Sequence, residues 1–185
     1  MKRVIDSKGH VTILGGPDDD IYVVGRTRGY AKGLCLTLEG HAYLLAENCR
    51  VEAGDESEVV CMDGTKARLM NNAKGYFQDT STGVLCGRSA AFAKGRAVLH
   101  VDDEGHVVAT EDARIIASGD AYVEATGCAM VIAQQRTEVT ALDQVCVHAY
   151  DEVFIMAGPQ CVVYIHSDNA RVVGGIQIYV KEELR

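Results

Sequence analysis

The residues of this chain that could do chemistry are its carboxylates, which are concentrated in one region. Residues 97–170 contain 12 acidic side chains and two basic ones, Arg114 and Arg136, a net charge of −10, whereas the whole 185-residue chain carries −8. Most of these carboxylates lie in short polar stretches between apolar segments. If alternate stretches stack above one another, one edge of the molecule carries an acidic ridge of Asp102, Asp103, Glu104, Asp120, Asp151, Glu152 and Asp168. Such a ridge attracts a basic protein surface and repels phosphate, although acidic corners also serve solubility alone.

Patterns of known catalytic and metal sites do not occur in the sequence. There is no G-x-x-x-x-G-K-[ST] phosphate loop and no G-x-S-x-G nucleophile turn, and the six histidines lack the spacing of metal ligands. The segment Gly15–Tyr22 resembles a single calcium β-roll unit, but such a site needs several stacked copies, so a turn or cap is the better interpretation. We therefore expect a non-enzymatic protein without catalytic residues, cofactor or metal.

An eight-residue period must position whatever function the chain has. Seven alanines recur at this spacing: Ala109, Ala117, Ala125, Ala133, Ala141, Ala149 and Ala157. A β-branched residue stands two positions before each of them, from Val107 to Ile155, and a small or apolar residue two positions earlier again. This alternation predicts a strand with one inward face. In a helix, by contrast, the alanines would drift by about 80° per repeat.

Five residues of strand followed by three of corner describe one edge of a β-solenoid. We expect an all-β fold with a single solenoid domain over 1–185: about 16 octads over 41–168, a cap with irregular coils over 1–40, and a second cap over 169–185. Stepping back by eights places Tyr43, Gly75 and Gly83 inward, with Phe77 and Leu85 filling the space beside the two glycines. Coils of two strands and of three strands both fit, and the small core favours two.

Outward positions of alternate strands form a second candidate surface in the two-strand arrangement. One face would carry Val98, Ile116, Met130, Ile132, Val162 and Tyr164, together with His100, Arg114, Cys146 and His148. This face is too apolar for a sheet fully exposed to water, which predicts self-association, most simply as a homodimer.

The cysteines and the hydropathy pattern bear on the compartment. The chain has seven cysteines, an odd number, with no C-x-x-C pair, and Cys49, Cys61 and Cys161 fall on inward positions. Reduced thiols fit this pattern better than a disulfide framework does. No apolar run is long enough to span a membrane, and the first residues lack a signal-peptide core. We expect a cytoplasmic protein that does not bind membranes.

The tract His106–Ala157 resembles the octapeptide-repeat (A-x-V-x-A) β-solenoid proteins of phages and prophages in gut and soil actinobacteria. The segments Asp120–Ala125 and Val145–Asp151 carry the resemblance best. It implies a fold but no catalytic residues. In that setting, in the cytoplasm of a host cell, the acidic ridge suggests an inhibitor of the anti-CRISPR or anti-restriction type that imitates DNA and binds a nucleic-acid-binding complex. A structural scaffold or virion fibre component assembled through the apolar face is the alternative, and a carbohydrate-binding side groove is a weaker one.

Overall fold

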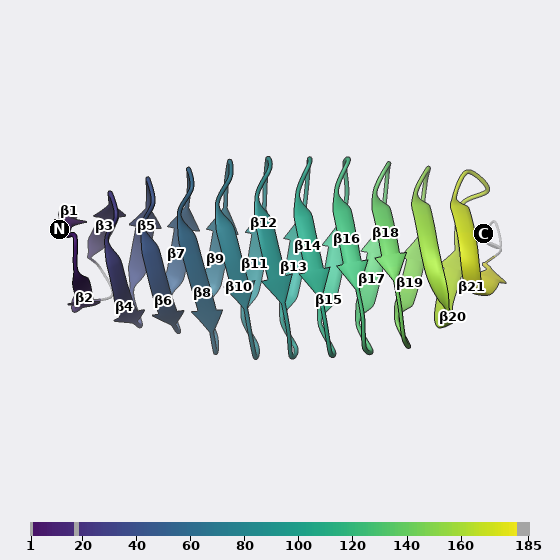
Figure 1. Ribbon diagram of the computed structural model, residues 1–185, viewed down its shortest axis with the longest axis horizontal. Helices are drawn as coiled ribbons and strands as arrows, with labels where there is room; N and C mark the ends of the chain where they lie inside the picture. The colour runs from purple at the N-terminus through teal and green to yellow at the C-terminus, as the bar shows by residue number, and fades with distance from the viewer. Residues whose placement is uncertain (1, 17–18, 181–185) are drawn as a thin grey trace, which may run out of the picture.

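The computed structural model describes residues 2–16 and 19–180, apart from the side chain of Lys2, and these residues form strands without any helix. The strands are β1 (Lys2–Asp6), β2 (His10–Ile13), β3 (Asp20–Val24), β4 (Arg28–Lys32), β5 (Cys35–Leu38), β6 (Tyr43–Glu47), β7 (Arg50–Ala53), β8 (Glu58–Met62), β9 (Lys66–Leu69), β10 (Lys74–Phe77), β11 (Thr82–Leu85), β12 (Ala90–Ala93), β13 (Val98–Val101), β14 (His106–Ala109), β15 (Arg114–Ala117), β16 (Tyr122–Ala125), β17 (Met130–Ala133), β18 (Glu138–Ala141), β19 (Cys146–Ala149), β20 (Phe154–Ile165) and β21 (Arg171–Tyr179). They stack along one axis, with β1 and β21 at opposite ends of the rod (Figure 1).

Each strand from β1 to β18 pairs in parallel with the strand two places along the chain, so a coil contains two strands. Val107 of β14 lies beside Val123 of β16, and Val131 of β17 lies beside Val147 of β19, so a coil spans two octads in both rows. β20 runs through a corner and joins the two rows into one sheet. The expected all-β solenoid is confirmed as a parallel β-solenoid of about 11 coils with two strands each.

The alternation of small and β-branched residues explains the core. In the regular coils the last strand residue, the residue two before it and the corner residue two earlier again point inward, as Ala117, Ile115 and Ala113 do, each at most 1% exposed. Two rows of Ala and Val pack against each other over this narrow interior. Cys49, Cys61 and Cys161 are buried among them, as the period predicts.

One aromatic ring compensates for the two core glycines. A Cβ built on Gly75 would lie 2.5 Å from Phe77 Cε2, and one built on Gly83 would lie 2.5 Å from Phe77 Cε1 and Cζ. Phe77 is fully buried, so its ring occupies the volume that both glycines leave free. The expected pairing of Gly75 with Phe77 is confirmed, whereas the side chains nearest to the space at Gly83 are Phe77 and Leu99 and not the expected Leu85.

The regular octads begin later in the chain than the expected position, residue 41. Tyr43 is only half-buried and points outward, whereas Leu44 is fully buried and takes the inward position. The reason is coil length: Tyr43 pairs with Glu58, one position short of two octads, because the corner between β6 and β7 is shorter than the later corners. The strand positions of Leu36 and Leu38 keep this earlier register and are buried.

The last coil is also irregular. Ala157 pairs with Gly174 and Val162 with Ile176, so the corner segment 158–161 lies opposite the single residue Gly175. Gly174 and Gly175 both adopt positive φ, at 79° and 68°, which a glycine accommodates without strain. This shift turns Ile176 and Ile178 to the outer side of their row, beside Val162 and Tyr164.

Candidate functional site

The predicted acidic ridge lies on one edge of the rod. We call the corners that follow the odd-numbered strands, together with residues 166–170 after β20, the odd-to-even edge. All seven predicted carboxylates occupy it, because its corners stack directly on one another, as the bond from Tyr122 N–H to Gly105 O shows (2.9 Å). The intervening corner 134–136 carries two glutamines and an arginine, so the row of carboxylates is interrupted.

Two of the seven carboxylates bind the backbone of the rod itself. Asp103 and Asp151 have φ of 61° and 57°, which places their side chains over the preceding coil. Asp103 Oδ2 accepts a hydrogen bond from Gly87 N–H (3.0 Å), and Asp151 Oδ2 accepts one from Gln135 N–H (3.0 Å). The opposite edge repeats the arrangement, where Asp143 accepts from Gly127 N–H (3.1 Å). These carboxylates satisfy corner N–H groups that the strand pairing leaves unbonded.

Two further carboxylates form ion pairs with the next or the preceding coil. Arg136 donates two hydrogen bonds to Asp120, at 2.6 and 2.7 Å, and Arg88 Nε donates one to Glu104 (2.8 Å). The bond from Arg136 lowers the pKa of Asp120, and Asp120 raises the pKa of Arg136. Among the described residues, Asp102, Glu152 and Asp168 form no ion pair, although Asp102 accepts a hydrogen bond from the Ser118 hydroxyl.

The predicted apolar face lies on the odd row, which is the stack of odd-numbered strands together with the second half of β20; the even row is the stack of even-numbered strands. We use the name apolar face for two columns of outward residues: Val98, Arg114, Met130, Cys146, Val162 and Ile176 in one, and His100, Ile116, Ile132, His148, Tyr164 and Ile178 in the other. Ile176 and Ile178 were missed from the sequence because they reach the face only through the register shift in β21. Arg114 is the one permanent charge on the face, and Ile176 is 54% exposed.

Histidines and tyrosines stack at the border of this face. His148 lies on Tyr164 with ring centroids 4.9 Å apart, and Tyr150 lies on His166 at 4.2 Å. His148 Nδ1 and His166 Nε2 are 3.1 Å apart, so one ring donates a hydrogen bond to the other. Burial, together with the nearby His166, lowers the pKa of His148.

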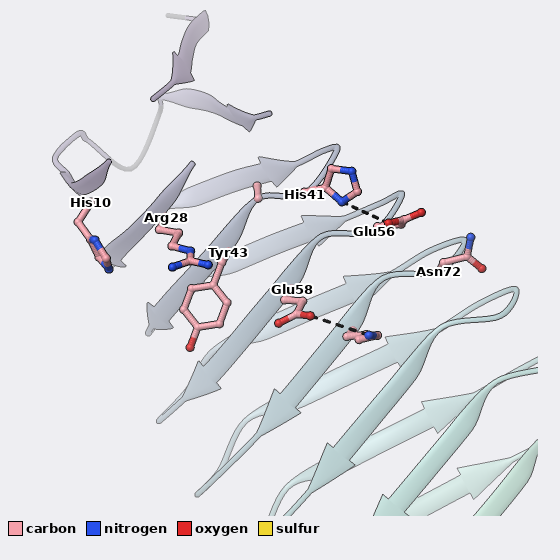
Figure 2. A pocket seen from close by; sticks show the side chains of 9 residues that line it. His10, Arg28, His41, Tyr43, Glu56, Glu58 and Asn72 are labelled. Carbon is pink, nitrogen blue, oxygen red and sulfur yellow. Dashed lines mark ion pairs between the residues drawn. The ribbon is translucent and has the colours of Figure 1, made fainter. Parts of the chain in front are cut away.

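A polar pocket near the N-terminal end was not foreseen. It has a volume of about 690 Å³ and lies over the starts of β2, β4, β6, β8 and β10. Figure 2 shows His10, Arg28, Tyr43 and Glu58 in sequence across these strands, with His41 turned toward Glu56. His41 Nδ1 lies 3.2 Å from Glu56, and Lys74 Nζ lies 3.9 Å from Glu58. An adjoining pocket of about 540 Å³ shares His10, Arg28 and His41, and its other lining residues are Lys8, Gly9 and Arg26.

No three His, Cys, Asp or Glu side chains in the described part of the chain are arranged to hold a metal ion, and that part contains no helix that could span a membrane. Comparison of the chain with known protein families, with curated proteins and with solved structures found no match, and its function is therefore inferred from its own residues.

Proposed function

We propose that this chain is a non-enzymatic binding protein that acts as a homodimer of rods joined through the apolar face. The observation that carries the proposal is the unbroken pair of columns on β13, β15, β17, β19, β20 and β21, in which one of twelve side chains is permanently charged. The even row differs. Its column Leu45, Val60, Tyr76, Phe92 and Val108 is apolar, but the neighbouring column is polar.

The size of the face sets the expected strength of the dimer. Six strands about 4.8 Å apart, with about four residues of about 3.3 Å each, give a footprint of about 13 by 29 Å. Two such footprints total about 750 Å², less than the roughly 1,200 Å² at which stable specific interfaces begin, so we expect a weak, transient dimer that dissociates in the high micromolar range. The isologous contact also leaves both corner edges of each rod free for another partner.

Sedimentation velocity across about 1–200 µM tests the dimer. Ile132→Asp places a charge at the centre of the apolar face and should leave a monomer over the whole range, because the partner would have to bury that carboxylate. Val108→Asp is the matched control on the even row and should leave the dimer intact. The proposal would be overturned if the dimer dissociated in Val108→Asp but persisted in Ile132→Asp. A native chain that remained monomeric at the highest concentration would overturn it too. Circular dichroism verifies that both variants fold.

The carboxylates without ion pairs on the odd-to-even edge support a second function, the DNA-imitating inhibitor in a host cytoplasm. Among the described residues, Asp102, Glu152 and Asp168 form no ion pair and accept no bond from a corner N–H group, in contrast to Asp103 and Asp151, so these three carboxylates can meet a basic partner. The triple change of these three to Lys should abolish inhibition of DNA cleavage in a panel of restriction nucleases and CRISPR effectors. Unchanged inhibition of a nuclease by this variant would exclude the edge as the binding surface.

The end segments have a proposed role as well. We propose that residues 1–40 and 169–185 cap the rod and limit end-to-end growth, because an uncovered strand edge invites pairing with another chain. The irregular coil lengths near the N-terminus and the shifted β21 are consistent with this role. A scaffold that grows into filaments would require the opposite behaviour, which electron microscopy of concentrated protein would reveal.

A further inference from the structure

One column of corner side chains on the odd-to-even edge shows how the rod neutralises charge. The strand registers place one residue of each corner in this column: Lys8, Arg26, His41, Glu56, Asn72, Arg88, Glu104, Asp120, Arg136, Glu152 and Asn169. Arg88 pairs with Glu104, Arg136 with Asp120, and His41 approaches Glu56. From the third corner onward, every arginine and histidine in the column therefore has a carboxylate on an adjacent coil.

The N-terminal end of the same column lacks this compensation. Lys8 and Arg26 occupy neighbouring corners, and His10 pairs in register with Arg28 just beyond them. Among the described residues, none of these four side chains forms an ion pair. They line the pocket of about 540 Å³ together with Gly9 and His41, and no carboxylate lines it. Like charges one coil apart, about 4.8 Å, repel each other, so this arrangement gains stability from a bound anion.

The backbone beneath these cations is held firmly. Thr27 is fully buried, and its hydroxyl donates to Val24 O and accepts from Ser7 N–H, both at 2.8 Å. These bonds tie the corner that carries Lys8 to the corner that carries Arg26. The next corner is attached in the same way, because His41 N–H donates to Gly25 O (2.8 Å). The cationic groups thus project from three fixed, stacked corners, which lowers the entropy cost of converging on one ligand.

We propose that this pocket, formed by Lys8, His10, Arg26, Arg28 and His41, binds a small oligophosphate anion such as the phosphate tail of a nucleotide or pyrophosphate. Three permanent positive charges match an anion with several negative charges, and two guanidinium groups can each bind phosphate through paired hydrogen bonds. The site favours a small ligand over a nucleic acid. A long polyanion that follows the edge beyond the pocket meets Glu56, Glu104 and Asp120.

Calorimetric titration of the native chain with pyrophosphate tests this proposal. We expect saturable binding that weakens about tenfold for each arginine removed, because a charge-assisted hydrogen bond contributes that much to affinity. The double variant Arg26→Gln/Arg28→Gln should therefore lose about 100-fold. The double variant Arg26→Lys/Arg28→Lys retains the charge without the paired hydrogen bonds of a guanidinium group. Its affinity for pyrophosphate should lie between those of the native chain and the glutamine double variant.

The matched control is the double variant Arg50→Gln/Arg68→Gln. These arginines belong to a second basic pocket on the odd row, of about 440 Å³, and removing them makes the same change in net charge. We expect this control to bind pyrophosphate as the native chain does. An equal loss in both double variants would overturn the proposal, because it would show attraction by net charge alone. The absence of binding at millimolar pyrophosphate would overturn it too, as would a duplex oligonucleotide that binds more tightly than pyrophosphate.

Discussion

The N-terminal coils and the C-terminal half of the rod share one parallel pairing but differ in coil length, core and corners. Coil length varies before β7, where Lys2 pairs with Asp20 but Arg28 pairs with Tyr43, whereas every coil from β7 to β19 spans two octads. Leucines, and then Phe77, fill the earlier core, while alanine and valine fill the later one. Corner cations stand unpaired at the N-terminal end of the described chain and are paired farther along the edge.

The difference shows what the coil requires and what it leaves open. Parallel pairing demands a constant separation between the two rows, and this separation is kept when large and small inward residues compensate each other. Most corners contain a residue in the left-handed region, which Gly, Asn and Asp adopt at low cost. In several corners an Asp, Glu or Gln side chain of the next coil accepts a hydrogen bond from the N–H group of that residue. Charge on the outer side is subject to neither demand, so the coil geometry does not account for departures from local neutrality there.

The largest expected effect comes from removing side-chain volume from the core around Phe77 and, for comparison, from the alanine–valine core of the later coils. Phe77→Ala should lower the free energy of unfolding by about 3–5 kcal/mol, because the ring fills the space of Gly75 and Gly83 as well as its own. Val131→Ala, in the uniform core of β17, removes two methyl-sized groups and should cost about 1–3 kcal/mol. Urea denaturation measures both. Equal losses would show that the region around Phe77 is no more dependent on a single side chain than the alanine–valine region.

Corner carboxylates can be divided by experiment into those that hold the fold and those that do not. Asp103→Gly removes the acceptor of Gly87 N–H but suits the positive φ, and should cost about 1 kcal/mol. Asp103→Asn keeps an oxygen acceptor without the charge and should be nearly neutral. Glu152→Gln is the comparison outside the hydrogen-bonded set and should leave the urea midpoint unchanged. If Asp103→Asn destabilised the rod as much as Asp103→Gly does, the charge and not the hydrogen bond would be the stabilising feature.

The sequence predicts the solenoid well because the octad is repeated without error where the core is made of small residues. From Val51 onward the period identifies the inward residues, including the glycines at 75 and 83, from patterning alone. The period wrongly predicts that Tyr43 points inward. The alternating pattern does not reveal the shortened corner, because Leu44 suits an inward position as well as Tyr43 does. At β21 the out-of-phase alternation of Ile176, Ile178 and Val180 indicates a slip, but it does not reveal that residues 158–161 lie opposite the single residue Gly175.

The candidate surfaces were predicted unevenly. Because the apolar face lies within the strict octads, its members follow from the period, with Ile176 and Ile178 as the exceptions. The acidic ridge was placed on the correct edge, but its division into bonded and unbonded carboxylates depends on φ at each corner, which the charge pattern does not reveal. The basic pocket was missed because the spacings from Lys8 to Arg26 and from Arg26 to His41 are not multiples of the octad, so no period of eight connects them.

The smallest expected effect concerns pH and the aromatic border of the apolar face. The pKa of His148 is lowered in the folded chain, so the unfolded chain binds the proton more readily. Stability should therefore be greatest above the ordinary histidine pKa of about 6.5 and fall as the pH drops through that value toward the folded pKa. His148→Phe keeps the stacking on Tyr164 but removes the proton, and should flatten this part of the profile of urea midpoint against pH. An unchanged slope in His148→Phe would assign the dependence to other groups. The N-terminal coils hold no such His–His contact among the described residues, so hydrogen exchange should show the loosening at β19 and β20 and not at β2 and β4.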